Sequence, residues 1–267
     1  MSDRGPGGLG RPTQWILDLD GVVWLAGTPI GDVAGAVDTI RRSGARVAFV
    51  TNNSSPTLAA LRRRLAAVGI DADPGELATS ARAAASLLEP GQSATVLAED
   101  GVLEALEERG VRPTAAGEGP GDAAVVGWSR QFDFAALTRI ATAARHTGRL
   151  VATNADPTHP TPDGLVPGSG ALLAAVATAS GVVPEVAGKP NAPMQRYLID
   201  SLGVTPGPGT VLVGDQPGTD GCMAAALGVA FALVDSGVTP PGSPVDECPV
   251  AVRRSDLVSL VAEVLGA

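Results

Sequence analysis

The sequence of 267 residues predicts an α/β protein built on parallel β-sheets. Two observations carry this prediction. Short apolar runs alternate along the chain with segments whose apolar residues recur at helical spacing, which is typical of βαβ units. Hydrophobic residues make up 45% of the chain, and this length is enough for one large or two modest domains with a sizeable core.

The predicted elements follow one another in a regular order. The apolar runs that we assign as strands cover residues 15–19, 46–50, 95–99, 123–127, 150–153, 186–188, 210–214 and 229–234. Helical spacing covers residues 33–40, 58–68, 101–109, 134–146, 171–180, 192–202, a stretch after Thr219 and 256–265. Gly44 and Gly69 end the first two helical patterns. In such sheets a ligand binds beyond the carboxyl ends of the strands, so the polar residues that follow the strands are the candidates for a site.

Composition excludes several classes of function. The net charge of -9 argues against nucleic-acid binding, and the longest basic run, residues 62–64, lies in a helical pattern and is expected to be a solvated face. No apolar run approaches the roughly 18–20 residues of a membrane helix. Two cysteines form no disulfide framework, which favours a cytoplasmic protein. Residues 1–13 are polar and Gly-rich, and we expect a disordered tail.

Carboxylates and hydroxyls follow the first two strands. Asp18 lies at the end of the first strand and Asp20 directly after it, and residues i and i+2 of an extended chain point the same way, so two negative charges converge there. Thr51, Asn52 and Asn53 follow the second strand directly before a helix, where hydroxyls and free N–H groups can bind an anion. Ordinary capping roles remain open for both groups when each is considered alone.

Two later strand ends carry charged residues as well. Lys189, the single lysine beside eighteen arginines, follows the strand at 186–188 and precedes a proline that fixes the turn. Asp215 and Asp220 follow the strand at 210–214. A solvent-exposed lysine and a capping aspartate are the alternatives. The four strand ends together favour one common site over four unrelated loops.

These segments resemble the four motifs of the haloacid dehalogenase superfamily of phosphatases. The motifs are DLDGV from Asp18, TNN from Thr51, GKP around Lys189 and GDQPGTD around Asp215. The resemblance is greatest to the subfamily of p-nitrophenylphosphatase-like, phosphoglycolate and pyridoxal-phosphate phosphatases, and it extends through most of the chain. It implies a Rossmann-like, doubly wound core made of residues 14–76 and 185–267, with an inserted α/β cap domain at 77–184. Relatives have Arg-Leu-Asp where this chain has Gln-Pro-Gly at 216–218, so a local contact in the fourth motif could differ.

The resemblance also implies roles in hydrolysis of a small phosphate monoester. Asp18 would be the nucleophile that forms an aspartyl-phosphate, Asp20 the general acid and base, and Lys189 the cation that neutralises Asp18 and the phosphate. Thr51 and the N–H of Asn52 would hold phosphate oxygens, and Asn53 would help to position the substrate or the loop. Relatives often dimerise through the cap, so the resemblance further implies a homodimer.

Charge arithmetic indicates a metal cofactor. The four aspartates carry -4 if all are ionised, the phosphate adds more negative charge, and Lys189 supplies only +1. A divalent cation is therefore needed, and Mg²⁺ prefers a few carboxylate oxygens, waters and a phosphate oxygen. By resemblance, its ligands are Asp18, the backbone carbonyl of Asp20 and Asp215, with Asp220 supporting them.

Two cap residues are candidates for contact with the leaving group. Trp128 follows a predicted strand, and His159 lies in a predicted Pro-rich loop at 156–160. Packing and a backbone-bonded loop histidine are the respective alternatives. Two other functions also remain as hypotheses: a phospho-accepting signalling switch, and a catalytically silent protein that binds phosphate compounds.

Overall fold

The computed structural model describes residues 9–115, 117–161 and 164–266, and the chain divides into two compact units. Unit 1 contains residues 1–51, 62–78 and 198–267, and unit 2 contains residues 52–61 and 79–197. The predicted tail at 1–13 lies largely outside the described residues. Within its described part, the N–H of Thr13 donates to the carbonyl of Gly209 over 2.8 Å. The predicted boundaries of core and cap stay a prediction.

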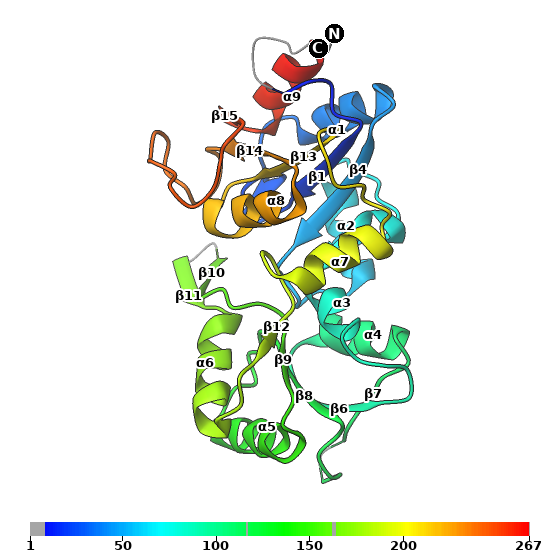
Figure 1. Ribbon diagram of the computed structural model, residues 1–267, viewed down its shortest axis with the longest axis vertical. Coiled ribbons are helices and arrows are strands. Elements are labelled where there is room, and N and C mark those ends of the chain that lie inside the picture. Colours follow the sequence, from blue (N-terminus) through cyan, green and yellow to red (C-terminus); the bar gives the residue numbers. More distant parts are fainter. Residues whose placement is uncertain (1–8, 116, 162–163, 267) are drawn as a thin grey trace. The chain divides into compact units, whose positions relative to one another are not determined.

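Unit 1 is built on a six-stranded sheet in the order β15-β14-β13-β1-β4-β5 (Figure 1). The pairs β15/β14, β14/β13, β13/β1 and β1/β4 are parallel. Helices α1 and α9 pack against each other, and α8 contacts β14. The bounds are β1 (Gln14–Asp18), β4 (Arg46–Thr51), β5 (Leu77–Thr79), β13 (Thr210–Gly214), β14 (Ala230–Val234), β15 (Val252–Arg254), α1 (Val33–Arg42), α8 (Cys222–Leu227) and α9 (Leu257–Leu265).

Shorter elements complete unit 1, and one helix crosses its limits. They are the antiparallel hairpin β2 (Trp24–Leu25) and β3 (Thr28–Pro29), the 3₁₀ turn η1 (Pro74–Glu76), the π-helical turn η2 (Pro217–Gly221) and helix α2 (Leu58–Ala67), whose residues fall in both units. The sequence predicted a helix after Thr219. That helix is α8, which starts at Cys222 after the turn η2, and such π-helical turns occur frequently at functional sites.

Unit 2 has its own five-stranded sheet in the order β12-β9-β8-β6-β7, and all of its strand pairs are parallel. Helices α5 and α6 pack together over a core that includes Val126, Ile140, Leu150 and Val176. The bounds are β6 (Ser93–Leu97), β7 (Arg112–Pro113), β8 (Ala123–Val126), β9 (Leu150–Ala152), β12 (Glu185–Val186), α3 (Ser80–Ala85), α4 (Asp100–Glu108), α5 (Phe134–Thr147), α6 (Ser169–Ser180) and α7 (Ala192–Asp200), the last of which ends in unit 1.

A hairpin replaces the loop that the sequence predicted around His159. Strands β10 (Thr158–Thr161) and β11 (Gly164–Pro167) are antiparallel, and His159 pairs with Val166. The expectation of a Pro-rich loop at 156–160 is therefore wrong for its second half. A two-stranded ribbon tolerates proline because its outward positions need no N–H donor for the ladder.

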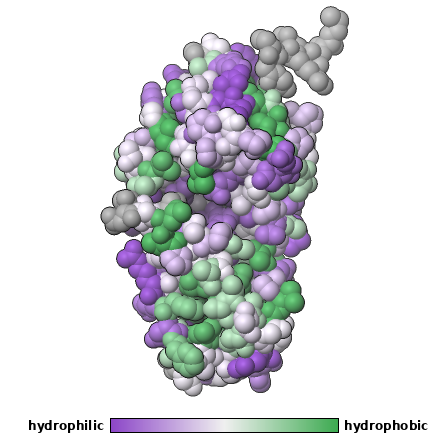
Figure 2. Space-filling view, turned by 90° about the vertical axis from the view of Figure 1, so that its left-hand side faces the viewer, coloured by the Kyte–Doolittle hydropathy of each residue, from purple (hydrophilic) through white to green (hydrophobic). Residues whose placement is uncertain are grey.

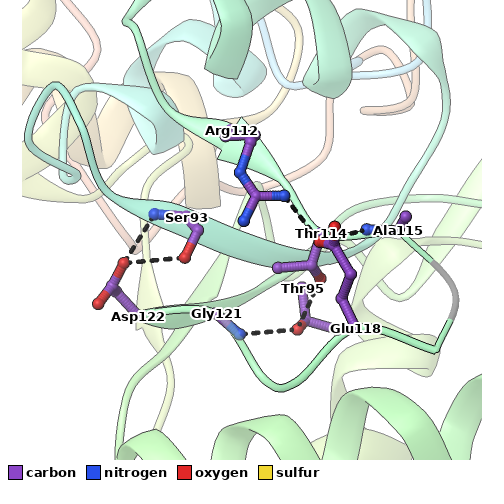
Figure 3. A network of polar contacts seen from close by, with 8 residues as sticks. All are labelled: Ser93, Thr95, Arg112, Thr114, Ala115, Glu118, Gly121 and Asp122. Atoms are coloured by element: carbon purple, nitrogen blue, oxygen red, sulfur yellow. Dashed lines mark hydrogen bonds and ion pairs between the residues drawn. The ribbon is translucent and has the colours of Figure 1, made fainter.

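Polar contacts join β6 and β7 to the segment between β7 and β8 (Figure 3). The Asp122 carboxylate accepts from the N–H of Ser93 over 2.7 Å and from its hydroxyl over 2.9 Å. These bonds from Ser93 hold the pKa of Asp122 below its usual value. Arg112 and Glu118 form an ion pair over 2.7 Å, which lowers the pKa of Glu118.

Among the described residues, no helix combines the length and the apolar character that crossing a membrane requires.

Candidate active site

Three predicted site residues lie at one edge of the unit 1 sheet. Asp18 is the last residue of β1, Thr51 is the last residue of β4, and Asp215 follows the end of β13 directly. β1 pairs in parallel with both neighbours. Because the carboxyl ends of parallel strands meet at the same edge, all three side chains start from the place where a ligand is expected.

The structure brings three of the predicted carboxylates together. One ligand atom each from Asp18, Asp215 and Asp220 lie within 4.8 Å of one another. Asp18 is 4% exposed, and Asp215 and Asp220 are fully buried. Three ionised carboxylates so close together in a buried place repel one another strongly unless a cation joins them. We call Asp18, Asp215 and Asp220 the acidic cluster.

The donor set of the acidic cluster fits a hard divalent cation. Every candidate ligand atom is a carboxylate oxygen, and the described part of the chain places no cysteine or histidine in the cluster. Oxygen-only ligand sets suit Mg²⁺ and Ca²⁺, whereas zinc sites usually include nitrogen or sulfur. The residues therefore fit the magnesium ion that the sequence predicted.

Main-chain N–H groups hold the individual carboxylates. The N–H of Leu19 donates to Oδ1 of Asp18 over 2.8 Å, and the N–H of Gln216 donates to Oδ2 of Asp220 over 3.2 Å. The Gln216 carbonyl also accepts from the N–H of Asp220 over 2.8 Å. The Gln-Pro-Gly at 216–218 thus belongs to a backbone turn that orients Asp220.

Two close backbone approaches surround Asp215. Gly21 has a φ of +86°, and a β-carbon there would overlap the Asp215 carboxylate. The backbone at Gly237 comes equally close to Asp215 from the segment after β14, and the N–H of Val238 donates to Oδ2 of Asp215 over 2.6 Å. Both positions require glycine, since any side chain would displace the carboxylate.

Asp20 lies outside the acidic cluster and has a partner of its own. It is half-buried, and Nε1–H of Trp24 donates to its Oδ1 over 3.0 Å. Trp24 is 2% exposed, and the Arg64 guanidinium lies 4.7 Å from its ring centroid. Arg64 is therefore not on a purely solvated face, as the sequence suggested for residues 62–64. Trp24 orients Asp20, a role that the sequence reasoning missed.

In unit 2, Asn52 and Lys189 bind each other. The N–H of Lys189 donates to Oδ1 of Asn52 over 2.8 Å, and Nδ2 of Asn52 donates to the Lys189 carbonyl over 3.3 Å. Nδ2 also donates to both carboxylate oxygens of Asp156, over 3.1 and 3.2 Å. Lys189 is 4% exposed, so it is not a solvent-exposed loop lysine. Asn53, in contrast, uses its Oδ1 to accept the N–H of Ser55 over 3.1 Å in a local turn.

The two predicted cap residues are neighbours within unit 2. The rings of Trp128 and His159 lie 5.7 Å apart between centroids, tilted by 44°. Nε1–H of Trp128 donates to the carbonyl of Pro167 over 2.9 Å, which ties the ring to β11. The guanidinium of Arg130 lies 5.5 Å from the same ring. A cavity of about 350 Å³ lies beside Trp128 and is lined also by Ser129, Phe132, Val166, Pro167, Ala171 and Leu172.

Comparison with known proteins identifies the family. The family model described as haloacid dehalogenase-like hydrolase matches residues 15–112, and one described as HAD-hydrolase-like matches residues 186–258. The chain is 35% identical over 227 residues to D-glycerol 3-phosphate phosphatase of Mycobacterium tuberculosis, covering 84% of this chain and 63% of that protein. It is 32% identical over 228 residues to the 5'-nucleotidase YutF of Bacillus subtilis, covering 84% of this chain and 88% of that protein. The chain thus spans less than two thirds of the M. tuberculosis relative.

Solved structures agree with this assignment. The p-nitrophenyl phosphatase from Archaeoglobus fulgidus superposes with a TM-score of 0.86 at 28% identity, covering 94% of this chain and 98% of that chain. A glycerol phosphate phosphatase from M. tuberculosis in complex with calcium superposes with a TM-score of 0.83 at 32% identity, covering 93% and 74%. The chain belongs to the haloacid dehalogenase-like hydrolases. The predicted resemblance and the predicted fold class are both confirmed.

Proposed function

We propose that this chain is a Mg²⁺-dependent phosphatase that hydrolyses small phosphate monoesters through an aspartyl-phosphate. The observation that supports it most is the acidic cluster, whose buried carboxylates fit a divalent cation. The chain is a phosphoric monoester hydrolase, as are the relatives named above. Mg²⁺ is the cofactor, and Asp18, the backbone carbonyl of Asp20 and Asp215 would hold it, with Asp220 supporting them.

The chain's own residues divide the reaction into two displacements. A carboxylate oxygen of Asp18 attacks the phosphorus, and the leaving alkoxide takes a proton from Asp20. The Asp20 carboxylate then removes a proton from a water molecule, whose oxygen attacks the phosphorus and releases phosphate and free Asp18. The bound Mg²⁺ supplies neutralisation of phosphate charge. The bond from the N–H of Leu19 fixes one Asp18 oxygen and thereby orients the other.

Positive charge and hydrogen bonds complete the phosphate site. Lys189 neutralises Asp18 and the phosphate, while Thr51 and the N–H of Asn52 hold phosphate oxygens and Asn53 shapes the loop that carries them. The mutual bonds of Asn52 and Lys189 support this assignment, because they fix the backbone of both residues. A compact ammonium suits a crowded buried place better than a guanidinium does.

The proposed substrates are small phosphorylated metabolites of the glycerol phosphate, phosphoglycolate, sugar phosphate or nucleotide class. Trp128 and His159 contact the leaving group, and the tilted pair of rings beside an apolar cavity supports this role. Trp128→Ala is expected to change the ranking of substrates by kcat/KM in a panel of phosphate esters. An unchanged ranking would remove Trp128 from the substrate site.

We further propose a cytoplasmic homodimer formed through unit 2. Both cysteines are free thiols, and the large apolar side chains of Phe134, Leu165 and Val183 are 85%, 72% and 87% exposed in unit 2. Figure 2 shows apolar side chains on the surface of unit 2 around α6. Light scattering on the purified chain is expected to give twice the mass of one chain, and Leu165→Asp to give monomers. A monomeric wild type would contradict this proposal.

The assay that tests the activity is phosphate release from p-nitrophenyl phosphate. We expect turnover with Mg²⁺, loss of turnover with a chelator, and a loss of at least about a thousand-fold in Asp18→Asn. Full activity in Asp18→Asn would refute the mechanism. A stable acyl-phosphate without turnover would instead indicate a phospho-accepting switch, and no reaction with any ester would indicate a silent binding protein.

A further inference from the structure

Both cysteines of the chain lie at one place in unit 1. Cys222 opens α8 and is half-buried, and Cys248 lies in the segment between β14 and β15, where it is 8% exposed. Sγ of Cys222 lies 3.9 Å from the carbonyl oxygen of Glu247, the residue that precedes Cys248. A β-carbon at Gly221 would overlap Sγ of Cys248. The two sulfurs are therefore neighbours although 26 positions separate them in the sequence.

Each of the two segments is connected to one carboxylate of the acidic cluster. Cys222 follows Asp220 by two positions. The segment that ends at Cys248 begins next to β14, where the Ser236 hydroxyl donates to the Gly21 carbonyl over 2.6 Å and the N–H of Val238 donates to Asp215 over 2.6 Å. We call residues 236–248 the Cys248 segment. It runs from the residue that bonds a carboxylate of the proposed metal site to one of the two cysteines.

The Cys248 segment is the part that would move if the sulfurs joined. A disulfide brings two sulfurs to about 2.05 Å, closer than any non-bonded contact. Cys222 is fixed by the helical turn, since its N–H bonds to the carbonyls of Pro217 and Thr219. Cys248 lies outside any helix or strand, and burial raises the pKa of its thiol, to which the nearby Cys222 sulfur contributes. Formation of the disulfide would therefore move Cys248 away from Gly221 and shift the Cys248 segment.

We propose that Cys222 and Cys248 form a reversible disulfide that weakens Mg²⁺ binding by the acidic cluster, an inference that rests on the proposed function for its metal. The oxidant is a low-molecular-weight disulfide such as oxidised glutathione. Cys222, the more exposed thiol, loses its proton and attacks one sulfur of that disulfide, releasing one thiol. Cys248 then loses its proton and attacks the Cys222 sulfur, which releases the second thiol. Movement of the Cys248 segment breaks the bond from Val238 to Asp215, so the carboxylate loses its orientation.

The test compares reduced and oxidised full-length protein. After treatment with oxidised glutathione and alkylation of remaining thiols, mass spectrometry is expected to find an internal bridge between the two cysteine peptides. Isothermal titration with Mg²⁺ is expected to show an affinity about tenfold weaker, in the range that loss of an outer-shell contact causes at metal sites. A thiol reductant is expected to restore it. Cys222→Ser keeps the buried Cys248 in place and is expected to show neither the bridge nor the shift.

The outcomes separate clearly. Glutathione adducts on either cysteine without a bridge, or a bridge with unchanged Mg²⁺ affinity, would overturn the inference. If Cys222→Ser fails to fold, Cys222→Ala provides the same comparison. Because binding is measured without substrate, a protein that shows the bridge and the shift but hydrolyses no ester would refute the proposed function and leave this inference standing.

Discussion

Replacing Trp24 by phenylalanine tests how Asp20 is held for proton transfer. The ring of Trp24 is 2% exposed and lies under Arg64, and phenylalanine retains most of these apolar contacts. The substitution removes the Nε1–H bond of 3.0 Å to Asp20. Hydrogen bonds to charged groups contribute about 1.5–3 kcal/mol, and a share of about 1.4 kcal/mol lost from the transition state of phosphoryl transfer lowers kcat/KM about tenfold.

Comparing two substrates shows whether the loss of activity in Trp24→Phe comes from poorer proton donation by Asp20. p-Nitrophenolate leaves readily without a proton, whereas the alkoxide of glycerol phosphate needs one from a general acid. We therefore expect Trp24→Phe to lower kcat/KM, which reports on phosphoryl transfer to Asp18, about tenfold for glycerol phosphate and much less for p-nitrophenyl phosphate. Equal losses for the two substrates would refute the positioning role of Trp24.

The chain offers a matched control for this substitution. Trp15 is also fully buried in unit 1, and its Nε1–H has no hydrogen-bond partner among the described residues. Trp15→Phe removes the same atoms without removing a bond. It is expected to lower the free energy of unfolding by a similar packing contribution and to leave the ratio of kcat/KM for the two substrates unchanged.

Three further predictions concern other residues. Lys189→Arg keeps the charge but is expected to lower kcat at least about a hundredfold, because the side chain is 4% exposed and a guanidinium is broader; near-wild-type turnover would contradict the assignment. Asn52→Leu leaves the N–H of Lys189 and the carboxylate of Asp156 without this partner, so chemical denaturation is expected to show a loss of about 2–4 kcal/mol, and an unchanged midpoint would contradict it. Asp122→Asn is expected to lower the thermal midpoint at neutral pH, and the decrease in the midpoint is expected to be smaller at acidic pH. Ser93 depresses the pKa of Asp122, so the stabilisation is present above the ordinary pKa and is lost as the pH falls through the folded value; a deficit independent of pH would contradict this.

The gathering of the acidic residues could be predicted from the sequence because it depends on the geometry of parallel strands. Asp18 ends β1 and Asp215 comes directly after β13, and adjacent parallel strands deliver their terminal residues to one edge of the sheet. Asp220 required only the short turn η2 to return to the same place. The parallel sheets themselves were predictable for the same reason, since apolar runs alternate with helical spacing throughout.

The contacts that hold these residues could not be predicted, since they depend on how loops return. Val238 reaches Asp215 from a segment more than twenty positions away, and no local pattern marks it. The turn at Gly21 brings Trp24 back to Asp20, and nothing in the sequence indicates that this tryptophan donates a hydrogen bond instead of only packing. The sequence did offer one indication of a close backbone approach, because Gly237 follows β14 after only two polar residues, Asp235 and Ser236. In unit 2, two prolines near His159 suggested a loop, but the ladder of β10 and β11 needs no N–H at Pro160.

Trapping the covalent intermediate tests the proposed chemistry most directly. Asp20→Asn cannot activate water, yet p-nitrophenyl phosphate still transfers its phosphoryl group because its leaving group needs no proton. Acid quenching of this variant with Mg²⁺, followed by digestion and mass spectrometry, is expected to find one phosphoryl group on Asp18, and none when a chelator is present. A phosphoryl group on another residue, or continued release of phosphate with Asp18 unmodified, would contradict the mechanism.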